Sequence, residues 1–231
     1  MQIHLFQGSH TPPVQSNVTI VVDVIRAFTV SFYALLQGAD RILLMETAEQ
    51  AIKFRQKNPT FLLAGETNGY PIEGFNFENS PYQIKQQELK GRTLVQKTTN
   101  GVRAALNCLD TEHLFVTGFA GAKTTAEYVR EEFADRLDPP VINIVASHPT
   151  DEDDFACAVY IKSILEGSRD ISFLEVINRI RQSEAAEKFF DEKKPEFKRE
   201  DLLICLEERP SDFVMKVNGT GKIPMIERVI V

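Results

Sequence analysis

The chain has 231 residues, of which 43% are hydrophobic and 26% are charged, and its net charge is -7. This composition is ordinary for a globular protein, and the lack of any apolar stretch near the roughly 20 residues of a membrane span excludes disordered and membrane-spanning classes. The negative charge argues against broad electrostatic binding of nucleic acid, which needs clustered Lys and Arg.

Short apolar runs alternate with amphipathic segments from the start to about residue 170. This alternation predicts an α/β fold with a layered, largely parallel or mixed sheet and helices on both faces. The expected strands are 17–24, 41–46, 60–64, 93–97, 113–118 and 141–147. The expected helices are 26–37, 48–56, 101–109 and 122–133, with another running through Ile164.

The composition changes after residue 170, where charged residues become dense. The segment 183–201 predicts an exposed helix pair broken at Pro195, and the end of the chain predicts a hairpin around Asn218 and Gly219. We therefore expect one phosphatase-like α/β domain over 1–231, with a C-terminal helical and hairpin addition from about 170 as a cap or edge.

Three cysteines, Cys108, Cys157 and Cys205, are far apart and odd in number, which favours reduced core thiols over disulfides or a zinc site. None has an Arg six positions later, so a cysteine-phosphatase loop is excluded. The N-terminus lacks the basic and apolar segments of an export signal, and we expect a cytoplasmic protein.

Ligands of open parallel sheets bind outside the carboxyl ends of the strands, so polar residues that follow strands are informative. Asp23 ends a buried run, and Arg26 opens the next helix. Asp23 could ligate a hard cation and Arg26 could bind phosphate or sulfonate oxygens. Asp23 could equally serve only as a helix cap.

A loop of seventeen residues, 65–81, follows the third expected strand and exceeds the usual connection length. Glu66 comes directly after that strand, and an ordinary surface loop explains it poorly. Asn79 precedes Ser80, and the Ser80-Pro81 pair predicts a helix that starts with Ser80 as its N-cap.

Lys97 is followed by four residues between a strand and a helix: Thr98, Thr99, Asn100 and Gly101. Hydroxyls, an amide and backbone N–H groups at that position favour an anion site over simple capping. The later segment 117–125 resembles a nucleotide phosphate loop but has the wrong glycine spacing, which leaves Lys123 as a secondary anion contact.

Four consecutive acids, 151–154, begin the helix that runs through Ile164. Helix-dipole stabilisation explains acids there, but coordination of Mg²⁺ by one or two, such as Glu152 and Asp153, would relieve the mutual repulsion of four. His148 could be an acid or base, although a structural hydrogen-bonding role is the more common one for such a residue.

These strand-end segments together provide acids for a hard metal, an anion cradle and an Arg, which suits metal-assisted attack on a phosphate ester. An aspartyl-phosphate enzyme would carry Asp-x-Asp at its first strand end, but position 25 is Ile. The residues therefore favour direct attack by a metal-activated water, with the transition-state charge held by Arg26, Lys97 and backbone N–H groups.

The motifs VVDVIRAFT, AGE followed by GFNFENSP, TTNGVRAA and DEDDFA occur in the order found in the 2-phosphosulfolactate phosphatase family. They span residues 20–158, and DLLICLEERPSDF near the end also resembles that family. The resemblance implies an Mg²⁺-dependent phosphatase that converts 2-phospho-3-sulfolactate to sulfolactate, a step toward coenzyme M where that is made.

Carried over by position, the resemblance implies a catalytic set of Asp23, Arg26, Glu66 and Glu152 and a metal-binding set of Asp23, Glu66, Glu152 and Asp153. The implied substrate-binding residues are Arg26, Asn79, Ser80, Thr98, Thr99, Asn100 and Gly101. The chain departs from the family pattern at Thr67, Asn76 and Glu78. Two alternatives therefore stay open: a divergent member acting on another small phosphorylated 2-hydroxy acid, and an inactive anion-binding module. A homo-oligomer also stays open.

Overall fold

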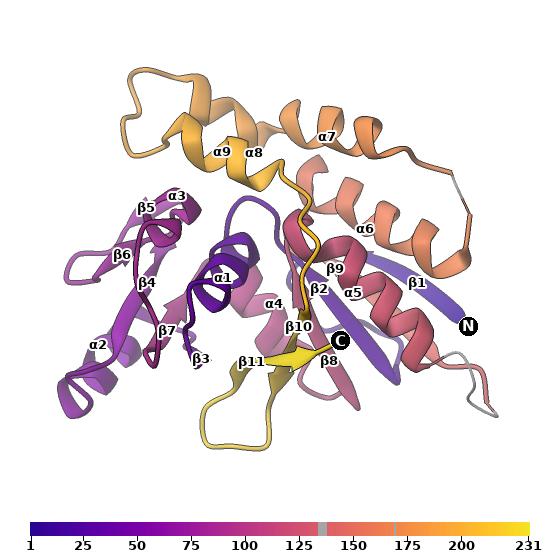
Figure 1. Cartoon of the computed structure of the whole chain (residues 1–231), viewed down its shortest axis with the longest axis horizontal. Coiled ribbons are helices and arrows are strands. Elements are labelled where there is room, and N and C mark those ends of the chain that lie inside the picture. The colour runs from indigo at the N-terminus through magenta and orange to yellow at the C-terminus, as the bar shows by residue number, and fades with distance from the viewer. Residues whose placement is uncertain (134–137, 169) are drawn as a thin grey trace.

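The computed structural model describes residues 1–133, 138–168 and 170–231, and its strands form one mixed sheet with helices on both faces (Figure 1). The α/β class predicted from the alternating pattern is therefore confirmed. The strands are β1 (Gln2–Gln7), β2 (Val18–Val22), β3 (Arg41–Leu44), β4 (Leu62–Thr67), β5 (Tyr70–Pro71), β6 (Phe77–Glu78), β7 (Thr93–Lys97), β8 (His113–Thr117), β9 (Val141–Ala146), β10 (Phe213–Asn218) and β11 (Met225–Ile230).

The helices follow the predicted order and start within a few residues of their expected positions. They are α1 (Ala27–Leu36), α2 (Ala48–Lys57), α3 (Pro81–Lys85), α4 (Gly101–Asn107), α5 (Phe119–Glu132), α6 (Glu152–Glu166), α7 (Phe173–Arg181), α8 (Glu184–Glu187) and α9 (Arg199–Cys205), with a 3₁₀ turn η1 (Lys188–Phe190) after α8. Among the described residues, no helix has both the length and the apolar composition needed to cross a bilayer.

Alternating side chains of the strands bury both faces of the sheet. In β2, Ile20 packs in the cluster formed with α5 and α6, whereas Val21 packs in the cluster that contains α4. In β3, Ile42 packs in the cluster with α1, whereas Leu43 packs with α2. Because successive side chains of a strand point to opposite faces, the continuous apolar runs in the sequence reflect strands covered on both sides.

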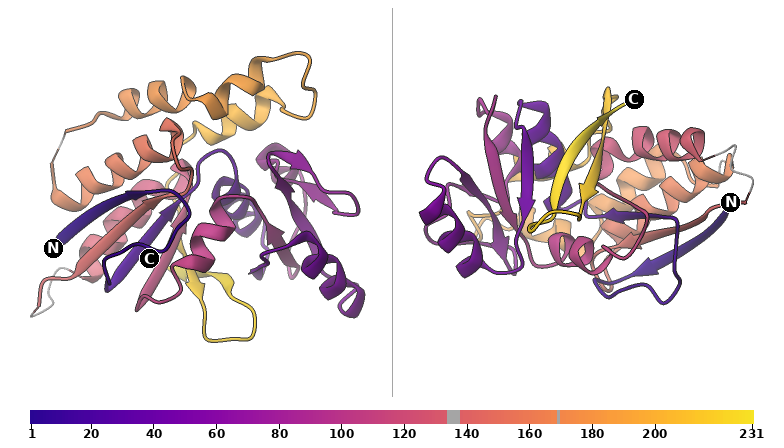
Figure 2. Two further views of the ribbon diagram at one scale, coloured as in Figure 1. Left: turned by 180° about the vertical axis from the view of Figure 1, so that it is seen from behind. Right: turned by 90° about the horizontal axis from the view of Figure 1, so that it is seen from below.

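The C-terminal hairpin β10–β11 lies in the middle of the sheet, between β8 and β3, and not at an edge. It joins two parallel blocks, β1-β9-β2-β8 and β3-β7-β4, and is antiparallel to its neighbour on each side. The sequence predicts the hairpin correctly, but its central place depends on pairing with strands about a hundred residues or more earlier in the chain. Figure 2 shows the hairpin, in yellow, between the two blocks.

Because of the hairpin, the strands of the second block run opposite to those of the first. Residues at the carboxyl ends of both blocks nevertheless line the same pocket. Six strand-to-strand steps separate β2 from β4 in the sheet. A twist of about 20 to 25° at each step accumulates to about 120 to 150°, which nearly compensates the reversal. The ends of β2 and β4 therefore converge, although the sheet is not parallel throughout.

The segment containing α7, α8, η1 and α9, which we call the cap, lies over these converging strand ends (Figure 1). Helix α7 packs on α6 of the first block, and α9 packs on α3 of the second. The cap therefore spans both blocks, and its residues Glu184, Ala185 and Lys188 line a pocket at the strand ends.

Candidate active site

The strand ends and the cap enclose a pocket of about 430 Å³. Seven of the eleven predicted site residues line it: Asp23, Arg26, Glu66, Asn79, Thr99, Asn100 and Asp153. The other four, Ser80, Thr98, Gly101 and Glu152, do not line it.

Asp23 follows β2 at the base of the pocket and is 6% exposed. Its carboxylate accepts hydrogen bonds from the Ala27 amide at 2.8 Å and the Ser147 hydroxyl at 3.1 Å. Burial raises the pKa of Asp23 to about 6, against the effect of these bonds and with a further contribution from the charge of Glu66. Asp23 thus caps α1 and also faces the pocket.

Gly101 supports Asp23 from behind. A Cβ built at Gly101 would lie 2.5 Å from Oδ2 of Asp23, so any larger residue would displace the carboxylate. Thr98 turns away from the pocket, and its hydroxyl accepts a hydrogen bond from the Val102 amide of α4. The side chain of Asn100 makes no capping bond to α4 and lines the pocket.

The acidic run at the start of α6 divides between the pocket and the surface. Asp151 is the N-cap, and Asp153 and Asp154 are each 2% exposed. Glu152 is displaced about 100° around the helix from each neighbour and points outward, where it forms an exposed ion pair with Arg179 at 2.6 Å. The structure thus does not bring Glu152 to the pocket and places Asp154 there instead.

Asp153 has an oxygen to which no described residue donates a hydrogen bond. Its Oδ2 accepts a hydrogen bond from the Ile25 amide at 3.2 Å, whereas Oδ1 is buried without a partner. Burial raises the pKa of Asp153 to about 8, with additional repulsion from Asp151 and Asp23. An isolated buried carboxylate oxygen is costly unless a proton or a cation accompanies it.

Asp154 is more fully satisfied than Asp153. Its oxygens accept hydrogen bonds from the amides of Val24 and His148 and from the Ser147 hydroxyl, at 2.7 to 3.0 Å. Burial, followed by repulsion from Asp153, raises its pKa well above the usual range. Asp154 therefore joins the ends of β2 and β9.

Glu66 joins the ends of β4 and β7. Its carboxylate accepts hydrogen bonds from the amides of Gly69 and Thr99 and from the Thr99 hydroxyl. Lys97 does not reach the pocket, because its ammonium donates to the carbonyl of Glu66 at 2.9 Å and to the Thr67 hydroxyl at 3.0 Å. The structure thus gives no support to Lys97 as a holder of transition-state charge.

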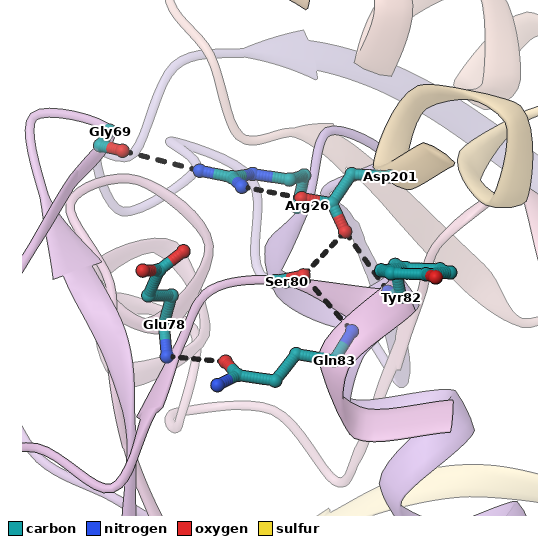
Figure 3. Close-up of polar contacts among 7 residues, drawn as sticks. All are labelled: Arg26, Gly69, Glu78, Ser80, Tyr82, Gln83 and Asp201. Carbon is teal, nitrogen blue, oxygen red and sulfur yellow. Dashed lines mark hydrogen bonds and ion pairs between the residues drawn. The ribbon is translucent and has the colours of Figure 1, made fainter. Parts of the chain in front are cut away.

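Arg26 is held by the cap (Figure 3). It is 5% exposed, and its guanidinium donates to Asp201 of α9 at 3.0 Å and to the Gly69 carbonyl at 3.2 Å. The other oxygen of Asp201 accepts hydrogen bonds from the Ser80 hydroxyl at 2.6 Å and the Tyr82 amide at 3.0 Å. Asp201 therefore ties Arg26 to the start of α3, and Ser80 acts as the predicted helix cap and not as a pocket residue.

Two aromatic rings of the cap pack on Arg26. Its guanidinium carbon lies 5.2 Å from the centre of the Phe189 ring and 5.5 Å from that of Phe197. Cation–π contacts of this kind favour a cation that has lost water on burial. The charge of Arg26 is thereby fixed at one side of the pocket.

The sequence reasoning missed Asp154, Asp201 and Lys188 as residues of the site. Asp154 stood in the same acidic run, and helical periodicity from Asp151 could have separated it from Glu152. Lys188 lines the pocket from the cap, in a segment expected to be exposed. Lys123 is exposed on α5 and is not a pocket residue.

The oxygen atoms of the pocket fit a hard cation such as Mg²⁺. Within the described residues, no three His, Cys, Asp or Glu side chains converge closely enough to hold a metal on their own. Mg²⁺, however, needs only one or two carboxylates together with water and substrate oxygens. Asp153 Oδ1 and Asn79 Oδ1 are both buried without a hydrogen-bond partner, and both residues line the pocket.

The departures from the family pattern lie outside the pocket lining. The Thr67 hydroxyl contacts Lys97, and the Asn76 amide oxygen accepts hydrogen bonds from the Leu63 amide and from Arg55. The backbone of Glu78 is held by Gln83 (Figure 3). The Thr67 and Asn76 side chains and the Glu78 backbone therefore stabilise the loop, and none of the three residues lines the pocket.

Known proteins match nearly the whole chain. The family model described as 2-phosphosulpholactate phosphatase matches residues 4–220. A protein of Bacillus subtilis (strain 168) named probable 2-phosphosulfolactate phosphatase is 49% identical over 231 residues, which is 100% of both chains. Proteins with the same name are 30% identical in Clostridium novyi (strain NT), over 71% of this chain and 68% of that one, and 26% identical in Clostridium perfringens (strain SM101 / Type A), over 92% and 90%.

Proposed function

Because the chain belongs to the 2-phosphosulpholactate phosphatase family, and is therefore a phosphoric monoester hydrolase, we propose that it releases phosphate from 2-phospho-3-sulfolactate with the help of Mg²⁺. The observation that carries this proposal is the pair of buried oxygens without partners, Asp153 Oδ1 and Asn79 Oδ1. The other buried acids of the pocket, Asp23, Glu66, Asp151 and Asp154, already accept hydrogen bonds. The departures from the family pattern lie outside that pocket, which favours the family substrate over another phosphorylated 2-hydroxy acid.

Asp153 and Asn79 would hold the cation, and Asp23 is near enough to raise the pKa of Asp153 by its charge. When bound, Mg²⁺ supplies Lewis-acid stabilisation of the negative charge on the phosphoryl oxygens. Glu66 was expected to be a ligand, but its oxygens already accept three hydrogen bonds, so we assign it the role of joining the two loops. Glu152 has no part in this arrangement.

Asp23 is suited to accept the proton of the attacking water, since a pKa of about 6 keeps it mostly ionised at neutral pH while leaving it basic enough to act. His148 lines the same pocket. Its Nδ1 accepts a hydrogen bond from the Asp151 amide at 3.0 Å, which leaves the Nε2–H group to donate a hydrogen bond to the substrate.

The test is the release of inorganic phosphate from 2-phospho-3-sulfolactate. We expect release with Mg²⁺, loss of release in excess EDTA, and loss in the Asp23→Asn variant. Turnover that is unchanged in EDTA would exclude the metal requirement. Faster turnover of phosphorylated 2-hydroxy acids that lack a sulfonate would exclude the proposed substrate, and thermal stabilisation by such acids without phosphate release would indicate a binding module.

A further inference from the structure

The pocket is divided by charge. Carboxylates from the ends of β2, β4 and the start of α6 form its lower part, whereas the two Lys or Arg side chains that line it in the described part of the chain are Arg26 and Lys188. Lys188 belongs to η1 of the cap, and Arg26 is held by the cap. The cap also contributes Glu184 to the lining, but Glu184 is exposed. An anionic substrate that enters therefore meets buried acids on one side and basic groups on the other.

The two basic residues differ in how their charge is balanced. Arg26 is paired with the buried carboxylate of Asp201 at 3.0 Å. Lys188 forms no ion pair within the described residues, and its ammonium lies 5.0 Å from the centre of the Phe197 ring, which also packs on Arg26. Burial, followed by the charge of Arg26, lowers the pKa of Lys188, against a smaller raising effect of the charges of Asp153, Glu66 and Asp151. A bound anion would stabilise the charged form of Lys188.

We propose that Lys188 binds a second anionic group of the substrate, a carboxylate or a sulfonate, while the phosphoryl group lies toward the cation that Asp153 and Asn79 would hold at the strand ends. The inference rests on the proposed function and assigns one of the two other acid groups of that substrate to Lys188. A half-buried ammonium with one aromatic face has lost part of its hydration, and a charge-assisted hydrogen bond to an anion replaces it. An ester without the second anionic group leaves Lys188 unpaired and is therefore a poorer substrate.

The kinetic test compares Lys188→Met, which keeps an unbranched apolar chain beside Phe197 but removes the ammonium, with Lys193→Met on the exposed turn of the same cap. Four esters are compared: 2-phospho-3-sulfolactate, the analogue without the sulfonate, the analogue without the carboxylate, and an alkyl phosphate without either. We expect Lys188→Met to raise KM about 10- to 100-fold for esters that carry the bound acid group. The alkyl phosphate and the Lys193→Met variant should be unaffected.

The pattern of losses identifies the group. If KM rises only for the two sulfonated esters, Lys188 binds the sulfonate. If KM rises only for the two carboxylated esters, Lys188 binds the carboxylate. An equal rise in KM for all four esters, including the alkyl phosphate, means that Lys188 binds the phosphoryl group and overturns the inference. An unchanged KM for every ester overturns it as well.

A binding measurement separates this inference from the proposed function. If no ester is hydrolysed, the proposed function fails, but calorimetric titration with sulfolactate and with inorganic phosphate still tests Lys188. We expect sulfolactate to bind the wild type and to bind Lys188→Met at least about 10-fold more weakly, with phosphate binding retained in both. Failure of sulfolactate to bind the wild type, or equal binding to both, overturns the inference. Lys188→Gln replaces Lys188→Met if the latter does not fold.

Discussion

The replacement of Asp201 by Ala should destabilise the protein strongly. Asp201 is fully buried, and its carboxylate accepts three hydrogen bonds, from the Arg26 guanidinium, the Ser80 hydroxyl and the Tyr82 amide. Removal of the carboxylate leaves the Arg26 charge, which is 5% exposed, without its counterion. Breaking one side of a buried ion pair costs about 3 to 5 kcal/mol.

The assay is urea denaturation of the wild type and of the variant, with the free energy of unfolding extrapolated to water. For a chain of this length, each kcal/mol lost from the free energy of unfolding lowers the melting temperature by about 2 to 4 °C. The melting temperature should therefore fall by about 6 to 20 °C. Glu200→Ala is the matched control, because Glu200 is the exposed neighbour in α9. It should change the free energy of unfolding by less than about 0.5 kcal/mol.

A double variant tests the cause. Arg26→Met with Asp201→Leu replaces both charges by apolar groups of similar reach, and such replacements are often close to neutral in stability. The double variant should therefore be more stable than Asp201→Ala. A loss below about 1 kcal/mol for Asp201→Ala would refute the reasoning, as would a double variant less stable than either single one.

Three further predictions concern the strand ends. Gly65→Ala should cost clearly more stability than Gly74→Ala, for which about 1 to 2 kcal/mol is expected. Both glycines have positive φ, but a Cβ at Gly65 would lie 1.9 Å from the Lys97 carbonyl oxygen, and nothing lies within 4 Å of one at Gly74. In turnover assays, Asp153→Asn should reduce kcat about 100-fold, whereas Glu152→Gln should stay within about twofold. In EDTA, Asp153 should make the free energy of unfolding fall as pH rises between 3.8, where it ionises in the unfolded chain, and about 8, its folded pKa, because the folded state binds the extra proton.

Each of these predictions has a result that contradicts it. Equal losses at Gly65 and Gly74 would mean that the loop adjusts around the added methyl group. A kcat for Glu152→Gln as low as that for Asp153→Asn would show that Glu152 reaches the reaction. For the pH prediction, calorimetry of the wild type and of Asp153→Asn gives the contribution of Asp153 by difference, and a stability gap that does not widen in favour of Asp153→Asn as pH rises would reject it.

The sequence by itself determined the order and type of most elements, because each depends on local pattern. Apolar runs marked β2, β3, β4, β7, β8 and β9, and the Ser80-Pro81 pair marked the start of α3. β1 was not predicted, since a partly exposed edge strand has a weak pattern. The sequence also located the strand-end loops, because polar side chains directly after buried strands have few structural reasons to be there.

Only the tertiary structure decided which members of those loops meet. Helical periodicity places Glu152 and Asp154 on different faces of α6, but only the packing of α6 decides which face meets solvent and which meets the pocket. Asp201 meets Arg26 across 175 positions, and no local pattern encodes such a contact. The central place of β10–β11, and the sheet twist that brings both sets of strand ends together, likewise depend on long-range pairing. Local periodicity specifies elements and faces, whereas a site assembled from distant segments is specified only when the whole sheet and its cap are packed.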